Sequence, residues 1–148
     1  MYRPNVTVAM VLKSGEHYLM VQERDKRSGD IVFNQPAGHL EENESLIDAC
    51  ARELFEETGL TADPLGLVGI YSLQAKNGVH YLRFCFYGEL DQCQDSTPQD
   101  SDIIACHWLT REEIETRALR SELVRRCIDD SRSQPLIPLS YLSYQVDA

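Results

Sequence analysis

The chain is poor in basic side chains. Its 148 residues include 14 lysines and arginines against 24 aspartates and glutamates, which gives a formal net charge of -10 at pH 7. A chain this acidic has no broad basic face, and this disfavours nucleic acid as a partner. If the substrate is nevertheless a polyanion, a local group of cations or a bound metal ion must offset the repulsion between like charges.

Paired cysteines and long apolar runs are also absent. The five cysteines include no C-x-x-C pair and no Cys/His array, so we expect free thiols rather than a zinc site. No apolar run approaches the roughly 20 residues that span a bilayer, and the first residues lack the pattern of a secretory signal. These absences predict a cytoplasmic protein with no membrane partner.

No internal repeat, low-complexity tract or Gly/Ser/Pro linker divides the chain, so residues 1–148 are expected to form one domain. Runs rich in β-forming residues predict strands at 6–12, 18–23, 31–34, 67–73 and 79–90, with a further apolar run at 105–109. Helices are predicted at 45–58, 111–116 and 122–131. This mixture is typical of the α+β class, as an α/β/α sandwich around a mixed β-sheet.

Three carboxylates lie close together on the first predicted helix. Ser45 is a candidate N-cap, and Gly59 provides a stop because glycine readily adopts the left-handed conformation. At 3.6 residues per turn, Glu53, Glu56 and Glu57 fall within an arc of about 100° near the C-terminal end. They repel one another and lie at the negative end of the helix dipole. Considered alone, the three glutamates are typical of a solvated helix face. If they are buried, they need a positively charged partner.

The residues around the triplet favour a functional interpretation. Gly38, Glu44, Arg52 and Gly59 stand at set spacings from the glutamates within the segment 38–60. This segment resembles the Nudix box, G-x5-E-x7-R-E-U-x-E-E-x-G-U, where U is a bulky aliphatic residue, and every specified position matches. The resemblance implies the Nudix (MutT-like) fold and a phosphoanhydride hydrolase, in which Gly38, Glu44 and Gly59 shape the box. A non-catalytic nucleotide-binding module would be expected to lack a box carboxylate.

The resemblance also implies a metal site. In Nudix enzymes the box carboxylates bind Mg²⁺ or Mn²⁺, so Glu53, Glu56 and Glu57 are the expected ligands, together with the backbone carbonyl of Ala37. Hard divalent cations prefer oxygen ligands, and Mg²⁺ commonly bridges carboxylates to substrate phosphates. Such an ion would also resolve the repulsion among the glutamates.

A further ligand is expected from a later loop. Asp102 stands six residues before Trp108, in a position similar to an acid of other family members, and Asp100 is the alternative. A loop whose Asp side chains hydrogen-bond to nearby backbone is an equally good interpretation of this stretch.

The family resemblance leaves the general base open between two glutamates. Members use different carboxylates to take the proton of the attacking water, and we favour Glu53, with Glu56 as the alternative. Arg52 is grouped with these catalytic candidates. We expect it to orient a glutamate, such as Glu44, rather than to bind phosphate directly.

Basic and aromatic residues outside the box are candidates for substrate contacts. Arg24, Lys26 and Arg27 form a cationic loop cluster, and Arg83 falls in a predicted strand. These side chains could hold phosphate, although a cationic loop tip is also ordinary solubilising surface. The candidates for contacting the rest of the substrate are His39, Tyr71 and Tyr81. Aromatic residues on strands usually belong to the core, and His39 could equally stabilise its loop.

Segments beyond the box narrow the substrate class. Residues 5–9, 33–41, 100–103 and 119–121 resemble a bacterial phosphatase branch of the Nudix family. This implies Mg²⁺-dependent hydrolysis of small phosphorylated substrates: nucleoside tri- and diphosphates, hydroxymethylpyrimidine pyrophosphate and thiamine pyrophosphate. The alternatives are an RNA 5′-end, dinucleoside polyphosphate or ADP-ribose pyrophosphohydrolase, of which the net charge disfavours the first.

Overall fold

The computed structural model describes residues 1–147, so the last residue of the expected domain 1–148 lies outside the described part. The strands are β1 (Asn5–Ser14), β2 (His17–Arg24), β3 (Ile31–Asn34), β4 (Ala37–His39), β5 (Gly66–Gln74), β6 (His80–Glu89) and β7 (Ile103–Thr110). The helices are α1 (Leu46–Thr58), α2 (Arg111–Glu115), α3 (Glu122–Ser133) and the short 3-10 helix η1 (Leu139–Tyr141). Among the described residues, no helix is long and apolar enough to cross a membrane.

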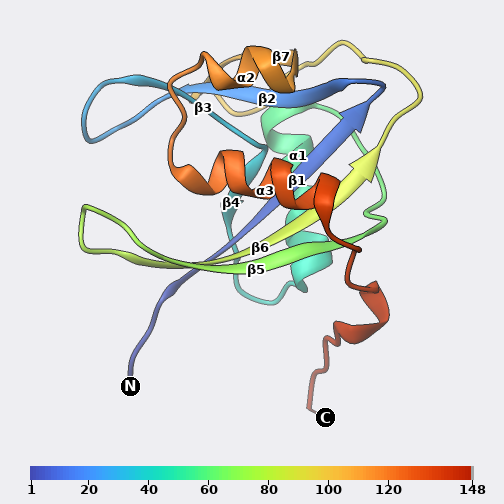
Figure 1. Cartoon of the computed structure of the whole chain (residues 1–148). Helices are drawn as coiled ribbons and strands as arrows, with labels where there is room; N and C mark the ends of the chain where they lie inside the picture. Colours follow the sequence, from blue (N-terminus) through green and yellow to red (C-terminus); the bar gives the residue numbers. More distant parts are fainter. Residues whose placement is uncertain (148) are drawn as a thin grey trace.

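The seven strands form one sheet, and this sheet is mixed, as the sequence predicts. Its order is β3-β2-β1-β6-β5, with β4 added on β1 and β7 on β2. The long β1–β6 pair is parallel and the other pairs are antiparallel. β1 pairs with β4 along residues 7–9 and with β2 only at residues 13–14. In Figure 1 it therefore runs diagonally from the β5–β6 part of the sheet to the β2–β7 part.

Helices cover both faces of the sheet, which confirms the expected α+β sandwich. α1 lies behind β1 in Figure 1, and its buried Leu54 packs in one core cluster with Leu19 and Phe86. α2 and α3 lie on the opposite face, where Ile114 and Ile128 belong to a second cluster. β1 contributes to both cores because its successive side chains point to opposite faces.

The helix signals read from the sequence are present. The Ser45 side chain accepts a hydrogen bond from the Asp48 N–H at 3.0 Å, and Gly59 ends α1 in the left-handed region at φ 73°. Neither β4 nor η1 was predicted. Three residues are too few to show a strand period, and β4 exists because residues 7–9 offer it a pairing edge.

Replacing Leu54 with alanine should destabilise the fold by about 2–5 kcal/mol, because the side chain is fully buried between α1 and the sheet. Its neighbour Phe55 is half exposed, so Phe55→Ala should cost about 1 kcal/mol or less. Urea unfolding of both variants checks this contrast. Equal losses would show that α1 does not bury the face described.

Candidate active site

The site lies where the edge of β4 meets the C-terminal half of α1. Met10 N–H donates to the Pro36 carbonyl at 3.0 Å, which turns the backbone groups of residues 36 and 38 toward β1. Because N–H and C=O groups alternate in direction along a strand, those of Ala37 and His39 point the other way. The free edge of β4 thus presents backbone donors and acceptors to α1.

Two side chains of α1 use this edge. The Ala37 N–H donates to Glu57 Oε1 at 2.8 Å, and Arg52 Nη2 donates to the His39 carbonyl at 3.0 Å. By the same alternation, the Ala37 carbonyl faces the carboxylates. This is the orientation that the expected role of Ala37 as a ligand requires.

Glu57 is a buried carboxyl group, with only 6% of its surface exposed. Burial raises its pKa to about 9, and the charges of Glu23, Glu53 and Asp100 act in the same direction, while the bond from Ala37 opposes the shift. The interpretation of the triplet as a solvated helix face is therefore wrong for Glu57. A carboxylate surrounded by other acids needs a proton or a cation to balance it.

Glu53 is the second sheltered carboxylate, and its side chain is 13% exposed. Burial raises its pKa, against the opposing effect of Arg52. Gly38 of β4 lies directly against it: a methyl group at this position would collide with the Glu53 carboxyl group. The absence of a side chain at the box glycine thus lets the Glu53 carboxyl group approach β4 closely.

Arg52 lies among the glutamates of the box. Nε and Nη2 form a bidentate pair with Glu44 at 2.9 and 2.7 Å. Nη1 reaches Glu53 at 2.8 Å and Glu56 at 3.2 Å. The pairing with Glu44 expected from the sequence is present, and Glu44 and Glu53 raise the pKa of Arg52 further above its ordinary value. Glu56 is the most open box carboxylate, with a side chain that is 45% exposed.

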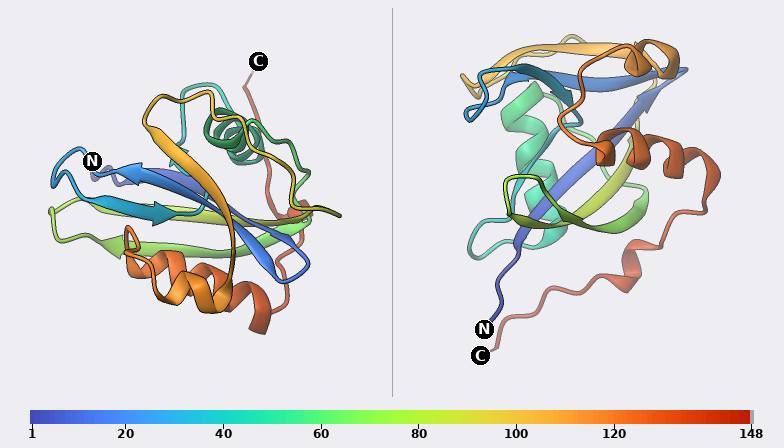
Figure 2. Two further views of the ribbon diagram at one scale, coloured as in Figure 1. Left: turned by 90° about the horizontal axis from the view of Figure 1, so that it is seen from above. Right: turned by 60° about the vertical axis from the view of Figure 1, so that its left-hand side comes forward.

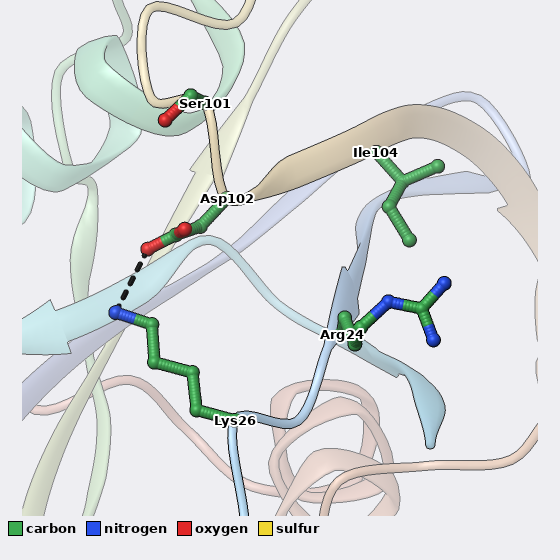
Figure 3. A pocket seen from close by; sticks show the side chains of 5 residues that line it. All are labelled: Arg24, Lys26, Ser101, Asp102 and Ile104. Atoms are coloured by element: carbon green, nitrogen blue, oxygen red, sulfur yellow. Dashed lines mark ion pairs between the residues drawn. The ribbon is translucent and has the colours of Figure 1, made fainter. Parts of the chain in front are cut away.

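The acids of the later loop occupy different places. Asp102 forms an ion pair with Lys26 at 3.0 Å (Figure 3). Asp100 is the one whose charge acts on Glu57, and its N–H donates to the carbonyl of Glu56 at the end of α1. The alternative position weighed from the sequence is therefore the one nearer to the box.

Two of the basic candidates flank a shallow cavity and two do not. Arg24, Lys26, Ser101, Asp102 and Ile104 line a cavity of about 270 Å³ (Figure 3). Arg27 is exposed in the same loop, outside this lining. Arg83 is buried, and its Nη2 donates to Asn34 Oδ1 at 3.2 Å and Gln35 Oε1 at 2.9 Å.

The remaining substrate candidates share one face of the sheet. Thr7 of β1 stands opposite both His39 and Arg83, and Arg83 stands opposite Tyr71. Cross-strand partners point to the same face, and Tyr81, two residues before Arg83, joins them. The rings of His39 and Tyr81 lie 6.4 Å apart between centroids. This face is opposite to the one on which Gly38 meets Glu53.

Glu23 of β2 is a residue of the site that sequence reasoning missed. Its charge acts on Glu57, and it pairs with Arg120 Nε at 2.7 Å. No motif around Glu23 indicates this role, since it comes from the position of β2 beside the end of α1. The segment 119–121, which contains Arg120, resembles the phosphatase branch of the family but carries no pattern that indicates this ion pair.

The donor set of the site fits a hard divalent cation. Its groups are the carboxylates of the box and the outward-facing carbonyl of Ala37, all oxygen ligands. Throughout residues 1–147, no three acidic, histidine or cysteine side chains stand where they could together hold a metal ion. Arg52 bonds both Glu53 and Glu56, and its planar group limits where these two carboxylates can lie.

Comparison with known proteins identifies the class of protein to which this acid cluster and its arginine belong. The NUDIX domain family matches residues 1–127, and the chain belongs to this family. Phosphatase NudJ of Escherichia coli K12 is 42% identical over 140 residues, covering 92% of this chain and 90% of that protein. The chain is accordingly a hydrolase of the Nudix family.

Solved structures show the same fold. A NUDIX hydrolase from Nitrosomonas europaea superposes with a TM-score of 0.89 at 41% identity, covering 97% of this chain and 98% of the other. The NUDIX domain of Shewanella oneidensis NrtR, solved with ADP ribose, superposes at 0.78 with 18% identity, covering 90% and 89%. At this lower identity the likeness concerns the fold.

Arg52→Lys should lower kcat by about tenfold or more, because lysine cannot form the bidentate bond that orients Glu44 while also holding Glu53. Arg111→Lys is the matched control, since Arg111 makes a similar two-pronged bond to Asp129 away from the box. Steady-state kinetics and circular dichroism compare the two. Equal activity of both variants would contradict a catalytic use of the Arg52 fork.

Proposed function

We propose that the chain is a divalent-metal-dependent Nudix hydrolase that cleaves phosphoanhydride bonds of small nucleotide-like molecules. The substrates proposed are nucleoside tri- and diphosphates, hydroxymethylpyrimidine pyrophosphate and thiamine pyrophosphate, in the manner of NudJ-like phosphatases. The observation that carries this proposal is the acidic cluster around buried Glu57, held against the edge of β4. The identity to NudJ along most of the chain supports the phosphatase branch.

The proposed ion is Mg²⁺, with Mn²⁺ as a substitute. Glu53, Glu56 and Glu57 would hold it with the Ala37 carbonyl. A loop acid would complete the set, and Asp100 is better placed for this than Asp102, which is paired with Lys26. When bound, the ion would lower the pKa of an attacking water and neutralise phosphate charge. It would also relieve the repulsion among the buried carboxylates of this site.

Glu53 is proposed to take the proton of the attacking water. Its sheltered position raises its pKa, and this brings the carboxylate closer to the range in which a general base works well near neutral pH. Glu56 remains the alternative and is far more exposed. Arg52 keeps the Glu53 carboxylate in place through Nη1, and it acts by orienting carboxylates rather than by binding phosphate.

The substrate is proposed to cross the edge of β4. Its phosphates would lie beside the carboxylates, where Arg24 and Lys26 provide the nearby cations of the cavity in Figure 3. Its ring would lie over the sheet face that carries His39, Tyr71 and Tyr81, where an aromatic surface can stack on a heterocycle. The acidic residues would repel such a substrate without the cations and the metal ion.

Phosphate release with Mg²⁺ or EDTA tests the proposal. The panel contains nucleoside di- and triphosphates, hydroxymethylpyrimidine pyrophosphate, thiamine pyrophosphate, ADP-ribose and a dinucleoside polyphosphate, each with and without added pyrophosphatase. Metal-dependent release of orthophosphate from the nucleoside di- and triphosphates, hydroxymethylpyrimidine pyrophosphate and thiamine pyrophosphate supports a phosphatase. Turnover of ADP-ribose or the dinucleoside polyphosphate alone would overturn the substrate range and keep the family mechanism.

Glu57→Gln should abolish most activity even at saturating Mg²⁺, because a charged ligand is lost while the amide oxygen can still accept from Ala37. Without metal, its free energy of unfolding should equal or slightly exceed that of the wild type, since one acid leaves a buried acidic cluster. Glu16→Gln, on the exposed β1–β2 turn, is the control. Full turnover of Glu57→Gln would refute its role as a ligand.

Lys26→Met should raise KM for a nucleoside triphosphate several-fold with little change in kcat, because the cation lines the cavity and its ion pair is with Asp102, not with a box carboxylate. Salt should weaken the difference between variant and wild type, since the interaction is exposed. Lys76→Met in the β5–β6 turn removes an equal charge elsewhere. Similar KM values for the two variants would show that Lys26 does not bind the substrate phosphates.

A further inference from the structure

Arg83 is a buried cation that the proposed chemistry does not use. It lies on β6 with 5% of its surface exposed, and one guanidinium nitrogen, Nη2, donates to both Asn34 and Gln35. Its Nε is buried with no hydrogen-bond partner in the part of the chain that the structure describes. Burying a guanidinium group among neutral amides is unfavourable, so its presence calls for a function.

Gln35 extends the contact of Arg83 to the other side of the core. The Gln35 side chain is almost completely buried, and its Nε2 donates to the Val124 carbonyl in the first turn of α3 at 2.6 Å. The three groups thus join β6, the segment before β4 and α3. These elements are far apart in the sequence, and they meet at residue 35.

This contact leads directly to the acidic site. Pro36 lies between Gln35 and Ala37. The proline ring restricts the backbone at Pro36, and the Pro36 carbonyl accepts a hydrogen bond from Met10 N–H, so the positions of Gln35 and Ala37 are closely linked. The Ala37 N–H holds Glu57, and the Ala37 carbonyl faces the same carboxylates. A displacement of residues 34 and 35 would therefore move the edge of β4 against α1.

We propose that Arg83 is a positioning residue: by holding Asn34 and Gln35, it places the backbone of Ala37 against Glu57. It acts through two buried amide side chains and does not contact the substrate. The inference rests on the proposed metal-dependent hydrolysis, because the geometry that Arg83 maintains is that of the oxygen ligands. It assigns to Arg83 a different role from the phosphate contact suggested by the sequence.

Binding of Mn²⁺ to the substrate-free protein, followed by electron paramagnetic resonance, is the direct test. Arg83→Met should weaken Mn²⁺ binding by about 10–100-fold, the effect typical of losing a partner that orients ligands. Arg83→Lys should recover part of the affinity, because an ammonium group can still donate to one amide oxygen. Arg126→Met is the control, since Arg126 pairs with Asp130 on α3 and is largely exposed.

Kinetics separate this role from the two alternatives. A positioning role predicts a lower kcat for Arg83→Met and a KM for nucleotide close to that of the wild type. A raised KM with unchanged kcat and Mn²⁺ affinity would show a substrate contact, and lower thermal stability alone would show a purely structural residue. Either result overturns the proposal.

A second variant guards against a failure to fold. Gln35→Met keeps the size of the buried side chain while removing the link between Arg83 and Val124, and it should reproduce the loss of Mn²⁺ affinity. Unchanged Mn²⁺ affinity in this variant would contradict the proposal. If the wild type binds Mn²⁺ but hydrolyses none of the substrates, the proposed function fails, while the Mn²⁺ comparison still decides the role of Arg83.

Discussion

The hydrogen bond from the Ala37 N–H to the Glu57 carboxyl group joins β4 to α1, and the remaining features of the site follow from that contact. It brings the C-terminal half of α1 against an open strand edge, so that Gly38 must leave room for Glu53 and the Ala37 carbonyl must face the acids. Burial then places several negative charges in a sheltered space. The fold thereby gathers negative charge that a divalent cation would balance.

Arg52 supplies positive charge among these acids. One guanidinium group bonds Glu44 in a bidentate pair and also reaches Glu53, Glu56 and a carbonyl of β4. The planar fork restricts where these carboxylates can lie, and bidentate geometry is more selective than charge alone. The same arginine therefore stabilises an acidic helix and orders the oxygen atoms that the proposed chemistry uses.

Local signals account for the parts of the structure that were predicted correctly. Ser45 and Gly59 delimit α1 through bonds and backbone angles within a few residues, and alternating apolar residues fix the long strands. The complete box identified the carboxylates because its spacing is unusually specific. The burial of individual side chains was not predicted. Glu57 and Arg83 are both buried. No local pattern indicates this, because exposure depends on elements far away in the sequence.

The sequence by itself determined the family, the limits of α1 and the set of acids on one helix, since each depends on spacing along a continuous segment. Only the tertiary structure decided which acids act on Glu57. It brought Glu23 from β2 and Asp100 from a distant loop to that carboxylate, and it tied Asp102 to Lys26 instead. The physical reason is that charge interactions and burial depend on distances in space, and strand register and packing, rather than spacing in the chain, set those distances.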